Sequence, residues 1–459
     1  MVAWRSKLAP LVISSVLGVT LAYFIVDKIW LSNRVASSPA SPTARAQSQP
    51  SGAPERSIAV LPFVDLSEKH DQEYFADGMA EEIIDLLAKV PDLHVPARTS
   101  SFYFKGKSAK IPEIARELSV ANVLEGSVRR SANRIRVTAQ LARADDGYHL
   151  WSQTYDRDLK DVFTVQDEIA NAVVQALQIT LMGGPLTRPR GGTENLEAYQ
   201  LYLRGLDADR QNTRASVLAA RDYFDQAIKL DPGFGLAWYA LAWDTTLLTH
   251  EGEFLPKDGY ERARQQAQHA LQLSPDLAEA HAELSYLHRA YDWNWAAAEA
   301  ESRTALTLDP KNPMALMQAA GLSNTLGRWD EAERQLRLAL TRDPFFPLLN
   351  WYLGDAQYFA GQFADSEATF RKMLDFAPGF AWTRAYLART LLAEDKAETA
   401  LAMVMQEDDE ENRLSMLSIA LHAAHREAEA EQALKMLIAK FADTDAYWVA
   451  MTYAHRGDQ

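Results

Sequence analysis

The chain has 459 residues, of which 47% are hydrophobic and 10% aromatic, enough apolar material for about two or three packed domains. Its 47 Lys and Arg residues face 62 Asp and Glu residues, and the net charge of −15 opposes the phosphate neutralisation that drives nucleic-acid binding. The sequence has no cysteine, which excludes disulfides, Cys-ligated zinc, iron–sulfur clusters and thiol catalysis. We therefore expect a globular protein without a nucleic-acid partner.

The first 31 residues contain a long apolar stretch that follows a short head over residues 1–7. Leu8–Val26 has no charged residue, and with Ile29–Leu31 it approaches the roughly 20 residues that span a bilayer. This pattern predicts a single transmembrane helix over residues 8–31. A cleaved signal peptide is the alternative, but the apolar run exceeds the usual length and the nearest small-residue site, Ala44–Ala46, is far downstream. Lys and Arg flank the stretch on both sides, so charge alone leaves the orientation open.

Residues 32–56 are rich in Ser, Pro, Ala, Thr and Gln and lack apolar periodicity. We predict a disordered linker there, with a mean reach of roughly 25–30 Å.

Residues 57–181 alternate strand and helix patterns, which predicts a compact α+β domain. Strands are expected at Ser57–Phe63, Leu93–Arg98, Ala121–Arg130, Arg134–Leu141 and Tyr148–Tyr155, with Ile135, Val137, Ala139 and Leu141 on one face. Helices are expected at Asp71–Lys89, Ile111–Leu118 and Val162–Leu181, and turns at Ser131–Asn133 and Asp145–Gly147.

The ordered motifs of this domain resemble the TolB-like (FlgO-like) amino-terminal domain: Ile58–Phe63, Glu73–Gly78, Ala97–Ser101, Val123–Arg129, Gln140–Leu141, Leu150–Trp151 and Val165–Ile169. Bacterial signalling proteins often place that domain between a membrane helix and tetratricopeptide repeats. The resemblance implies a Gram-negative inner-membrane protein with its bulk in the periplasm. A winged-helix or class III cyclase domain often precedes the membrane helix in such proteins. This sequence shows no such module before residue 8, so that activity is not carried over.

Some conspicuous residues of this domain have structural interpretations. Asp77–Gly78 and Glu125–Gly126 are typical of turns or strand edges, with a small-ligand pocket as the alternative. Arginines cluster around the predicted hairpin, on a solvated face or on a patch that contacts a partner or lipid. Gly106–Ser108 is not a phosphate-binding loop, because Ser101 stands where that motif requires glycine.

A connector over residues 182–193 leads to a helical repeat over residues 194–459. Pro232, Pro275, Pro310, Pro344 and Pro378 end helical segments, and the later ones recur at 35, 34 and 34 residues. This spacing is the signature of tetratricopeptide repeats. Small residues recur where the two helices of a repeat must cross closely: Ala220, Ala227, Ala263, Ala270, Ala298, Ala305, Ala332 and Ala339.

We expect about six helix pairs and one terminal helix, Thr444–His455. The second repeat is expected to carry an insertion near Glu251–Gly259, and Glu407–Glu411 to form a solvated acidic loop. Glycines at 205, 327, 354 and 361 suit close contacts or turns.

The first helices of such an array line its concave face, which predicts a protein- or peptide-binding surface. The family's groove positions fall on Tyr239, Trp243, Tyr286, Arg289, Asn324, Trp351, Asp355 and Arg389. Packing between repeats is the alternative role for any one of them. No catalytic motif is present, no cofactor is expected, and the close pair His422 and His425 lacks the carboxylates that would complete a metal site. The sequence therefore predicts a non-enzymatic, membrane-anchored scaffold, with a sensory subunit of a separate cyclase or winged-helix regulator as the alternative.

Overall fold

The computed structural model describes residues 54–179, 186, 192–209, 214–250, 252–380, 382–407, 409–442 and 446–456, all within one compact unit that spans Ala53–Gln459. The predicted head, the transmembrane helix over residues 8–31, nearly all of the linker and most of the connector lie outside these residues. Among the described residues, no helix combines the length and the apolar character needed to cross a membrane.

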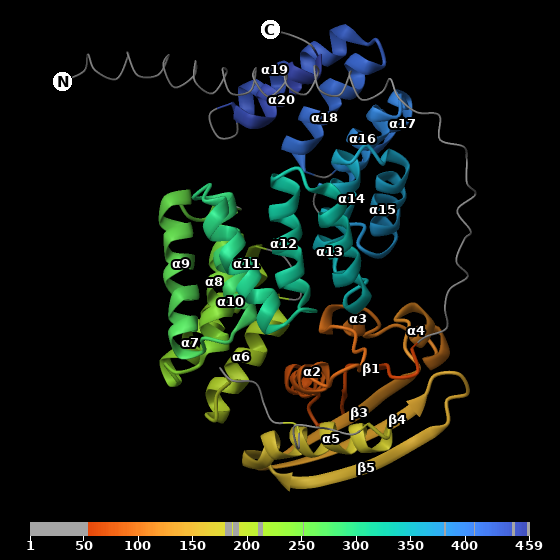
Figure 1. The fold of residues 1–459 in the computed structure, drawn as a ribbon, viewed down its shortest axis with the longest axis vertical. Helices are drawn as coiled ribbons and strands as arrows, with labels where there is room; N and C mark the ends of the chain where they lie inside the picture. Colours follow the sequence, from red (N-terminus) through yellow and green to blue (C-terminus); the bar gives the residue numbers. More distant parts are fainter. Residues whose placement is uncertain are drawn as a thin grey trace, which may run out of the picture. The chain divides into compact units, whose positions relative to one another are not determined.

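A five-stranded sheet forms the first part of the described chain (Figure 1). Its strands are β1 (Ile58–Val60), β2 (Val64–Asp65), β3 (Asn122–Ser131), β4 (Arg134–Arg143) and β5 (His149–Asp158). The order is β1-β3-β4-β5, and β2 also pairs with β3. β1 and β2 run parallel to β3, whereas β3, β4 and β5 form an antiparallel meander. The predicted first strand, Ser57–Phe63, is shorter in the structure: β1 ends at Val60, two residues before Pro62, which has no backbone N–H to donate, and β2 begins beyond the predicted range.

Two helices, α2 (Glu73–Ala88) and α5 (Val162–Ala176), share one hydrophobic core with the sheet. The four side chains predicted to line one face of β4, from Ile135 to Leu141, are all buried in that core. α4 (Ile111–Glu117) belongs to a second, smaller core with Ala59 and Val123. The α+β organisation expected from the sequence is therefore confirmed for these elements.

The predicted strand over Leu93–Arg98 is wrong. Only an isolated bridge joins His94 to Ser57, and Arg98 already begins a short helix, α3 (Arg98–Phe102). The backbone N–H of Ala97 donates instead to the carbonyl of Arg342, 2.6 Å away in the repeats. The N–H that would have donated to a neighbouring strand therefore donates to the end of α13 instead.

The interpretation of Asp77–Gly78 and Glu125–Gly126 as turn or strand-edge residues is also wrong. Asp77 and Gly78 lie inside α2, where a Cβ at Gly78 would overlap the side chain of Leu203. Gly126 lies in β3, a central strand, where a Cβ would come within 2.6 Å of the Thr138 carbonyl oxygen and 2.8 Å of the Phe63 ring. Both glycines permit close packing.

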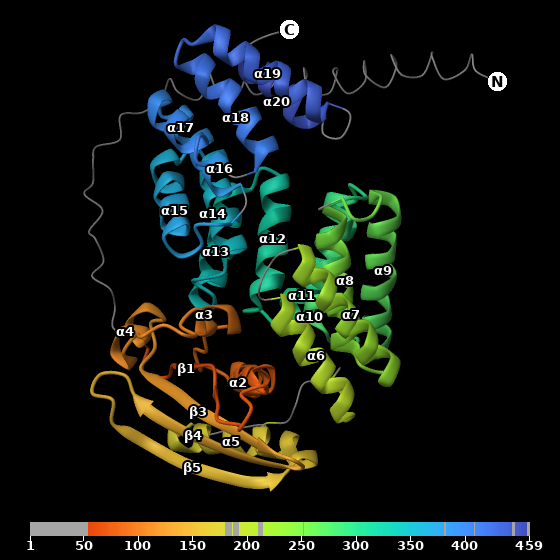
Figure 2. The ribbon, with the colours of Figure 1, turned by 180° about the vertical axis from the view of Figure 1, so that it is seen from behind.

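The rest of the described chain forms seven helix pairs and a terminal helix (Figures 1 and 2). The pairs are α6 (Leu196–Asp209) with α7 (Arg214–Leu230), α8 (Gly235–His250) with α9 (Pro256–Leu273), α10 (Ala278–Ala290) with α11 (Trp295–Leu308), α12 (Pro313–Thr325) with α13 (Trp329–Arg342), α14 (Pro347–Phe359) with α15 (Phe363–Phe376), α16 (Thr383–Ala393) with α17 (Ala397–Val404), and α18 (Glu410–Ala423) with α19 (Glu427–Phe441). The terminal helix is α20 (Ala446–Arg456).

This arrangement is a tetratricopeptide-type solenoid, and the predicted small residues explain its packing. All eight of the alanines expected at helix crossings are fully buried. A Cβ at Gly354 would lie 2.7 Å from the ring of Phe370, while Gly327 and Gly361 occupy turns with positive φ. Five second helices end two residues before a proline, and the residue after each helix donates its N–H back into the last turn, as Asp343 does to Ala339 at 3.0 Å.

Two expectations for the C-terminal half need correction. The described residues form seven helix pairs rather than about six, because α16 and the eight-residue α17 form a short pair that lacks the proline signal. Glu407 does not belong to a solvated loop: its side chain is buried and accepts hydrogen bonds from the backbone N–H groups of Ala385 and Asp409, both at 3.2 Å.

The α+β part contacts the loop between α13 and α14. The ring of Tyr103 stacks on Phe345 with 4.1 Å between centroids, and Ser100 Oγ donates to Asp343 at 2.5 Å. The backbone N–H of Phe345 donates to Ser100 Oγ at 2.9 Å. We call these contacts, together with the Ala97–Arg342 hydrogen bond, the junction. The sequence did not predict it.

Candidate protein-binding surface

The eight predicted binding residues all lie on first helices of the pairs. Successive first helices from α8 to α18 contact one another, whereas no comparable contact joins successive second helices of the described pairs. The first helices therefore form the inner side of the curve. We call the side of α8, α10, α12, α14 and α16 that carries these residues the inner face: Tyr239, Trp243, Tyr286, Arg289, Asn324, Trp351, Asp355 and Arg389, all partly buried.

Three of the eight residues meet at α14 and α16. Arg389 Nη2 donates to Asp355 Oδ1 at 2.6 Å, and both side chains are about one-eighth exposed. The guanidinium lies over the rings of Tyr358 and Tyr386, 4.0 and 4.4 Å from their centroids. Trp351 packs edge-on against Tyr386 with 4.8 Å between centroids. Burial raises the pKa of Asp355, and Arg389 opposes that effect.

A second group lies on α10. Arg289 is 5.3 Å from the ring centroid of Tyr286, whose hydroxyl is hydrogen bonded to His250. Its Nη2 also donates to the hydroxyl of Tyr352 on α14 at 3.4 Å. This reach is possible because Gly321 on α12 leaves space: a Cβ there would lie 3.0 Å from the same nitrogen. Arg289 thus links three successive pairs along the inner face.

Within the described residues, no hydrogen bond or ring contact joins the other three predicted residues to either group. Tyr239 packs against the cluster of Ala270, Leu277 and Ala280, and Trp243 packs against the core between α12 and α14. For these two aromatic residues, the structure shows packing between repeats. Asn324 lies near the end of α12, and its Oδ1 is buried without a hydrogen-bond partner among the described residues.

The inner face also contains donors without acceptors. Within the described part of the chain, Trp351 Nε1, Arg289 Nε and Arg389 Nε are buried and have no hydrogen-bond partner. Buried polar groups in proteins are nearly always hydrogen bonded, to protein or to water. These three nitrogens are thus closed off from solvent by the side chains around them.

Two buried acids on the first helices were missed. Asp244 on α8 is fully buried, and neither of its carboxyl oxygens has a partner among the described residues. Burial, reinforced by Asp209, raises the pKa of Asp244 well above its usual range. Burial also raises the pKa of Glu283 on α10 to about 7, although Thr246 Oγ1 donates to it at 2.5 Å. An acid inside an apolar helical run such as Leu241–Leu248 was the signal that could have found Asp244.

No group of three or more His, Asp or Glu side chains could hold a metal ion in the described part of the chain. His422 Nδ1 lies 2.9 Å from Glu427 Oε2, and His425 occupies the positive-φ turn between α18 and α19. Both histidines therefore lie where α18 ends and the turn to α19 begins.

Comparison with known proteins gives partial matches. No protein-family model matches the chain. A stretch of 202 residues, 44% of this chain, is 44% identical to "Putative adenylate cyclase 3" of Rhizobium meliloti (strain 1021). The match covers 34% of that relative, so the chain spans about a third of the length of the curated relative it matches.

Solved structures resemble parts of the chain. A tetratricopeptide repeat protein from Parabacteroides merdae is 14% identical, with a TM-score of 0.38, and the match covers 56% of this chain and 98% of that one. PilF of Pseudomonas aeruginosa is 19% identical, with a TM-score of 0.37 over 48% of this chain and 96% of that one. A human IFIT1 dimer bound to m7Gppp-AAAA is 13% identical, with a TM-score of 0.43 over 65% and 75%. At these TM-scores, the description of the fold rests on the helix pairs themselves.

Proposed function

We propose that this chain is a non-enzymatic scaffold whose inner face holds a protein partner. The observation that carries the proposal is the group of Trp351, Asp355 and Arg389 with the rings around it. Aromatic and arginine side chains dominate the energetics of protein interfaces, and here they lie together on α14 and α16 beside the exposed ring of Phe359. A peptide segment that supplies apolar side chains to these rings fits this chemistry.

The scaffold is tethered to a bacterial inner membrane in this proposal, with its bulk in the periplasm. The support is the uncharged stretch Leu8–Val26 followed by a polar linker, and the resemblance of residues 57–181 to TolB-like domains. Reporter fusions placed after Ser57 test the orientation. An active periplasmic reporter is expected, and a signal only from a cytoplasmic reporter would overturn the assigned side of the membrane.

In-cell crosslinking followed by mass spectrometry tests the binding surface. Phe359 is 47% exposed, and its ring centroid is 5.4 Å from the Arg389 guanidinium, so Phe359→Ala removes contact area with little effect on the core. Trp351→Phe keeps a ring and removes the Nε1 donor. Met436→Ala, which truncates a 42% exposed side chain on the second helix α19, is the matched control.

We expect the wild type and Met436→Ala to recover the same partners, and both inner-face variants to recover at least roughly tenfold less of them, the effect of losing about 1.4 kcal/mol. Equal recovery by Phe359→Ala and Trp351→Phe, or no partner above background in the wild type, would show that the inner face is not the binding surface.

A second candidate is a regulatory subunit that acts with a separate adenylate cyclase. The observation that favours it is the 44% identity to the Rhizobium protein that carries the cyclase name, although the match covers a third of that protein. Deletion of the gene should then change the cellular cyclic AMP level, with restoration by the wild type as the control. Unchanged cyclic AMP across stress conditions would exclude this role.

A further inference from the structure

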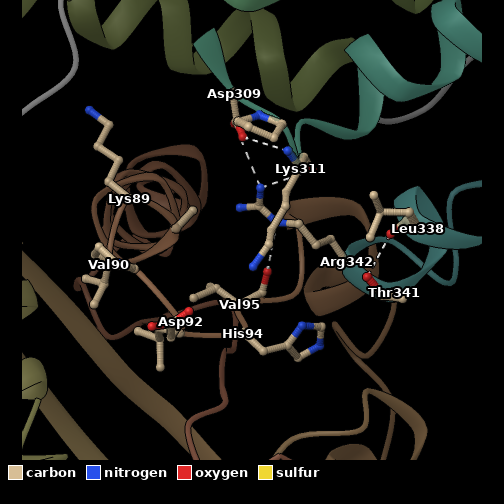
Figure 3. A pocket seen from close by; sticks show the side chains of 14 residues that line it. Lys89, Val90, Asp92, His94, Val95, Asp309, Lys311, Leu338, Thr341 and Arg342 are labelled. Carbon is tan, nitrogen blue, oxygen red and sulfur yellow. Dashed lines mark hydrogen bonds and ion pairs between the residues drawn. The ribbon is translucent and has the colours of Figure 1, made fainter. Parts of the chain in front are cut away.

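A pocket of about 340 Å³ lies beside the junction, between the segment that follows α2 and the ends of two repeats (Figure 3). Its volume falls at the lower end of the range of roughly 300–1,000 Å³ that is usual for small-molecule sites. It is lined by Ala88–Val95 from the α+β part, by Asp309–Lys311 from the α11–α12 loop, and by Leu338, Thr341 and Arg342 from α13.

Three cationic side chains from separate segments line this pocket. Arg342 is held by its Nε, which lies 3.5 Å from the Val95 carbonyl oxygen, and by its Nη1, which donates to the Lys311 carbonyl oxygen at 3.2 Å. Within the described part of the chain, no hydrogen bond or ion pair involves Arg342 Nη2, Lys89 Nζ or Lys311 Nζ. The ammonium group of Lys89, however, points away from the other two, and the charges around it are those of Asp85, Glu82, Glu279 and Asp276 (Figure 3). Arg342 Nη2 and Lys311 Nζ are therefore the donors available to a ligand in the pocket.

Two acids also line the pocket. Asp309 is engaged within its own loop, since it accepts the backbone N–H of Lys311 at 3.0 Å and lies 3.8 Å from Arg342 Nη1. Asp92 is the other acid. Burial lowers the pKa of His94, and the charges of Arg342 and Lys311 lower it further, so both cations act on the same side chain of the pocket wall.

We propose that this pocket binds a small phosphate-bearing anion through Arg342 Nη2 and Lys311 Nζ. Phosphate suits the site better than a carboxylate, because it presents three strong acceptor oxygens to donors that come from two segments. The guanidinium supplies a fixed, planar donor and the ammonium group of Lys311 supplies a mobile charge. This site is separate from the inner face and does not rest on the proposed protein partner.

The ligand would contact both the α+β part and the repeats, because the pocket wall over Val90–Val95 belongs to the first and Lys311 and Arg342 belong to the second. A ligand that binds only the assembled junction stabilises it by mass action. A small phosphorylated molecule in the pocket would thus strengthen the contact between the two parts.

Titration calorimetry of the purified full-length chain with inorganic phosphate, at constant ionic strength, tests the proposal. Lys311 is exposed, so K311A removes one donor without opening the core. K372A, which removes an exposed lysine on α15, is the charge-matched control. Circular dichroism checks that both variants are folded, and the His94 ring resonance in NMR reports on the pocket itself.

We expect saturable binding at one site in the wild type and the control, with a phosphate-dependent shift of the His94 resonance. Binding by K311A should be at least roughly tenfold weaker, since a charged hydrogen bond contributes about 1.5–3 kcal/mol. Absence of saturation in the wild type, equal affinity of K311A and K372A, or succinate binding as tightly as phosphate would overturn the assignment.

Discussion

Replacement of Asp343 by asparagine separates the charge of the junction from its geometry. The Asp343 side chain is buried and accepts a hydrogen bond from Ser100 Oγ at 2.5 Å. Burial raises its pKa to about 7, although the hydroxyl groups of Ser100 and Thr99 and the charge of Arg342 oppose that effect. Asparagine has nearly the same shape, cannot ionise, and offers Oδ1 to the same hydroxyl.

The sign of the effect follows from proton binding. Between the ordinary aspartate pKa of 3.8 and about 7, the folded chain holds a proton on Asp343 that the unfolded chain has released. The contribution of this group to stability therefore falls as pH rises through this window, and is constant above it. Over the part of the window from pH 5 to pH 7 the loss is roughly 2–3 kcal/mol. D343N cannot ionise at this position and lacks this loss. The free energy of unfolding of D343N, relative to that of the wild type, should therefore rise by roughly 2–3 kcal/mol between pH 5 and pH 8.

Urea unfolding at pH 5 and pH 8 measures this difference, and hydrogen exchange of the junction segments 97–103 and 343–346 measures it locally, since repeat arrays can unfold in steps. D222N, which changes an exposed carboxylate in the middle of α7, is the control and should leave the wild-type pH dependence unchanged. A difference between D343N and the wild type that is the same at both pH values would refute the reasoning, because it would show that Asp343 does not change its protonation in this range.

Two further predictions concern backbone and packing. Trp293 is 77% exposed and holds a φ of 54° in the turn where the next repeat has Gly327. W293G should therefore raise the unfolding free energy by about 0.5–1 kcal/mol, and G327A should lower it by about 1 kcal/mol, both measured from urea midpoints. A destabilised W293G would show that the tryptophan contributes through contacts. G205A places a Cβ against the ring of Phe224 and should lower the unfolding free energy by about 1–3 kcal/mol. In G379A the new Cβ meets nothing within 4 Å, so the unfolding free energy should fall by less than about 0.5 kcal/mol. Equal stability of the two variants would mean that α6 shifts without cost.

The sequence predicted those elements whose signals are local. Apolar periodicity placed α2, β4 and the repeat helices, and the alternation of Ile135 to Leu141 identified the buried face of β4. The prediction failed where a distant partner decides the structure. Ala97 bonds to Arg342, and Ser100 bonds to Asp343 across 243 residues, so Leu93–Arg98 becomes a loop and a helix start. No pattern within residues 57–181 contains that information.

The candidate site was predicted in the same partial way. Repeat spacing placed all eight residues on first helices, but it did not show that Arg389 pairs with Asp355 or that Trp243 packs into a neighbouring core. Their role in binding a partner stays a prediction. The pocket was not foreseen, because Val95 and Arg342 are 247 positions apart and meet only through the junction.

One helix connects the junction to the inner face. α14 begins at Pro347, two residues after Phe345, whose backbone N–H donates to Ser100, and it carries Trp351 and Asp355 on the inner face. If phosphate in the pocket changes the position of α14, it changes the affinity for a partner on the inner face, and linkage then requires that the partner change the affinity for phosphate by the same factor. We therefore expect reciprocal changes of roughly 5- to 150-fold, the usual range for coupled sites. Calorimetry with phosphate in the presence and absence of a recovered partner measures one direction, and partner titration with and without phosphate measures the other. Equal affinities in both experiments would show that α14 holds the two sites independently, and that the pocket acts on the junction alone.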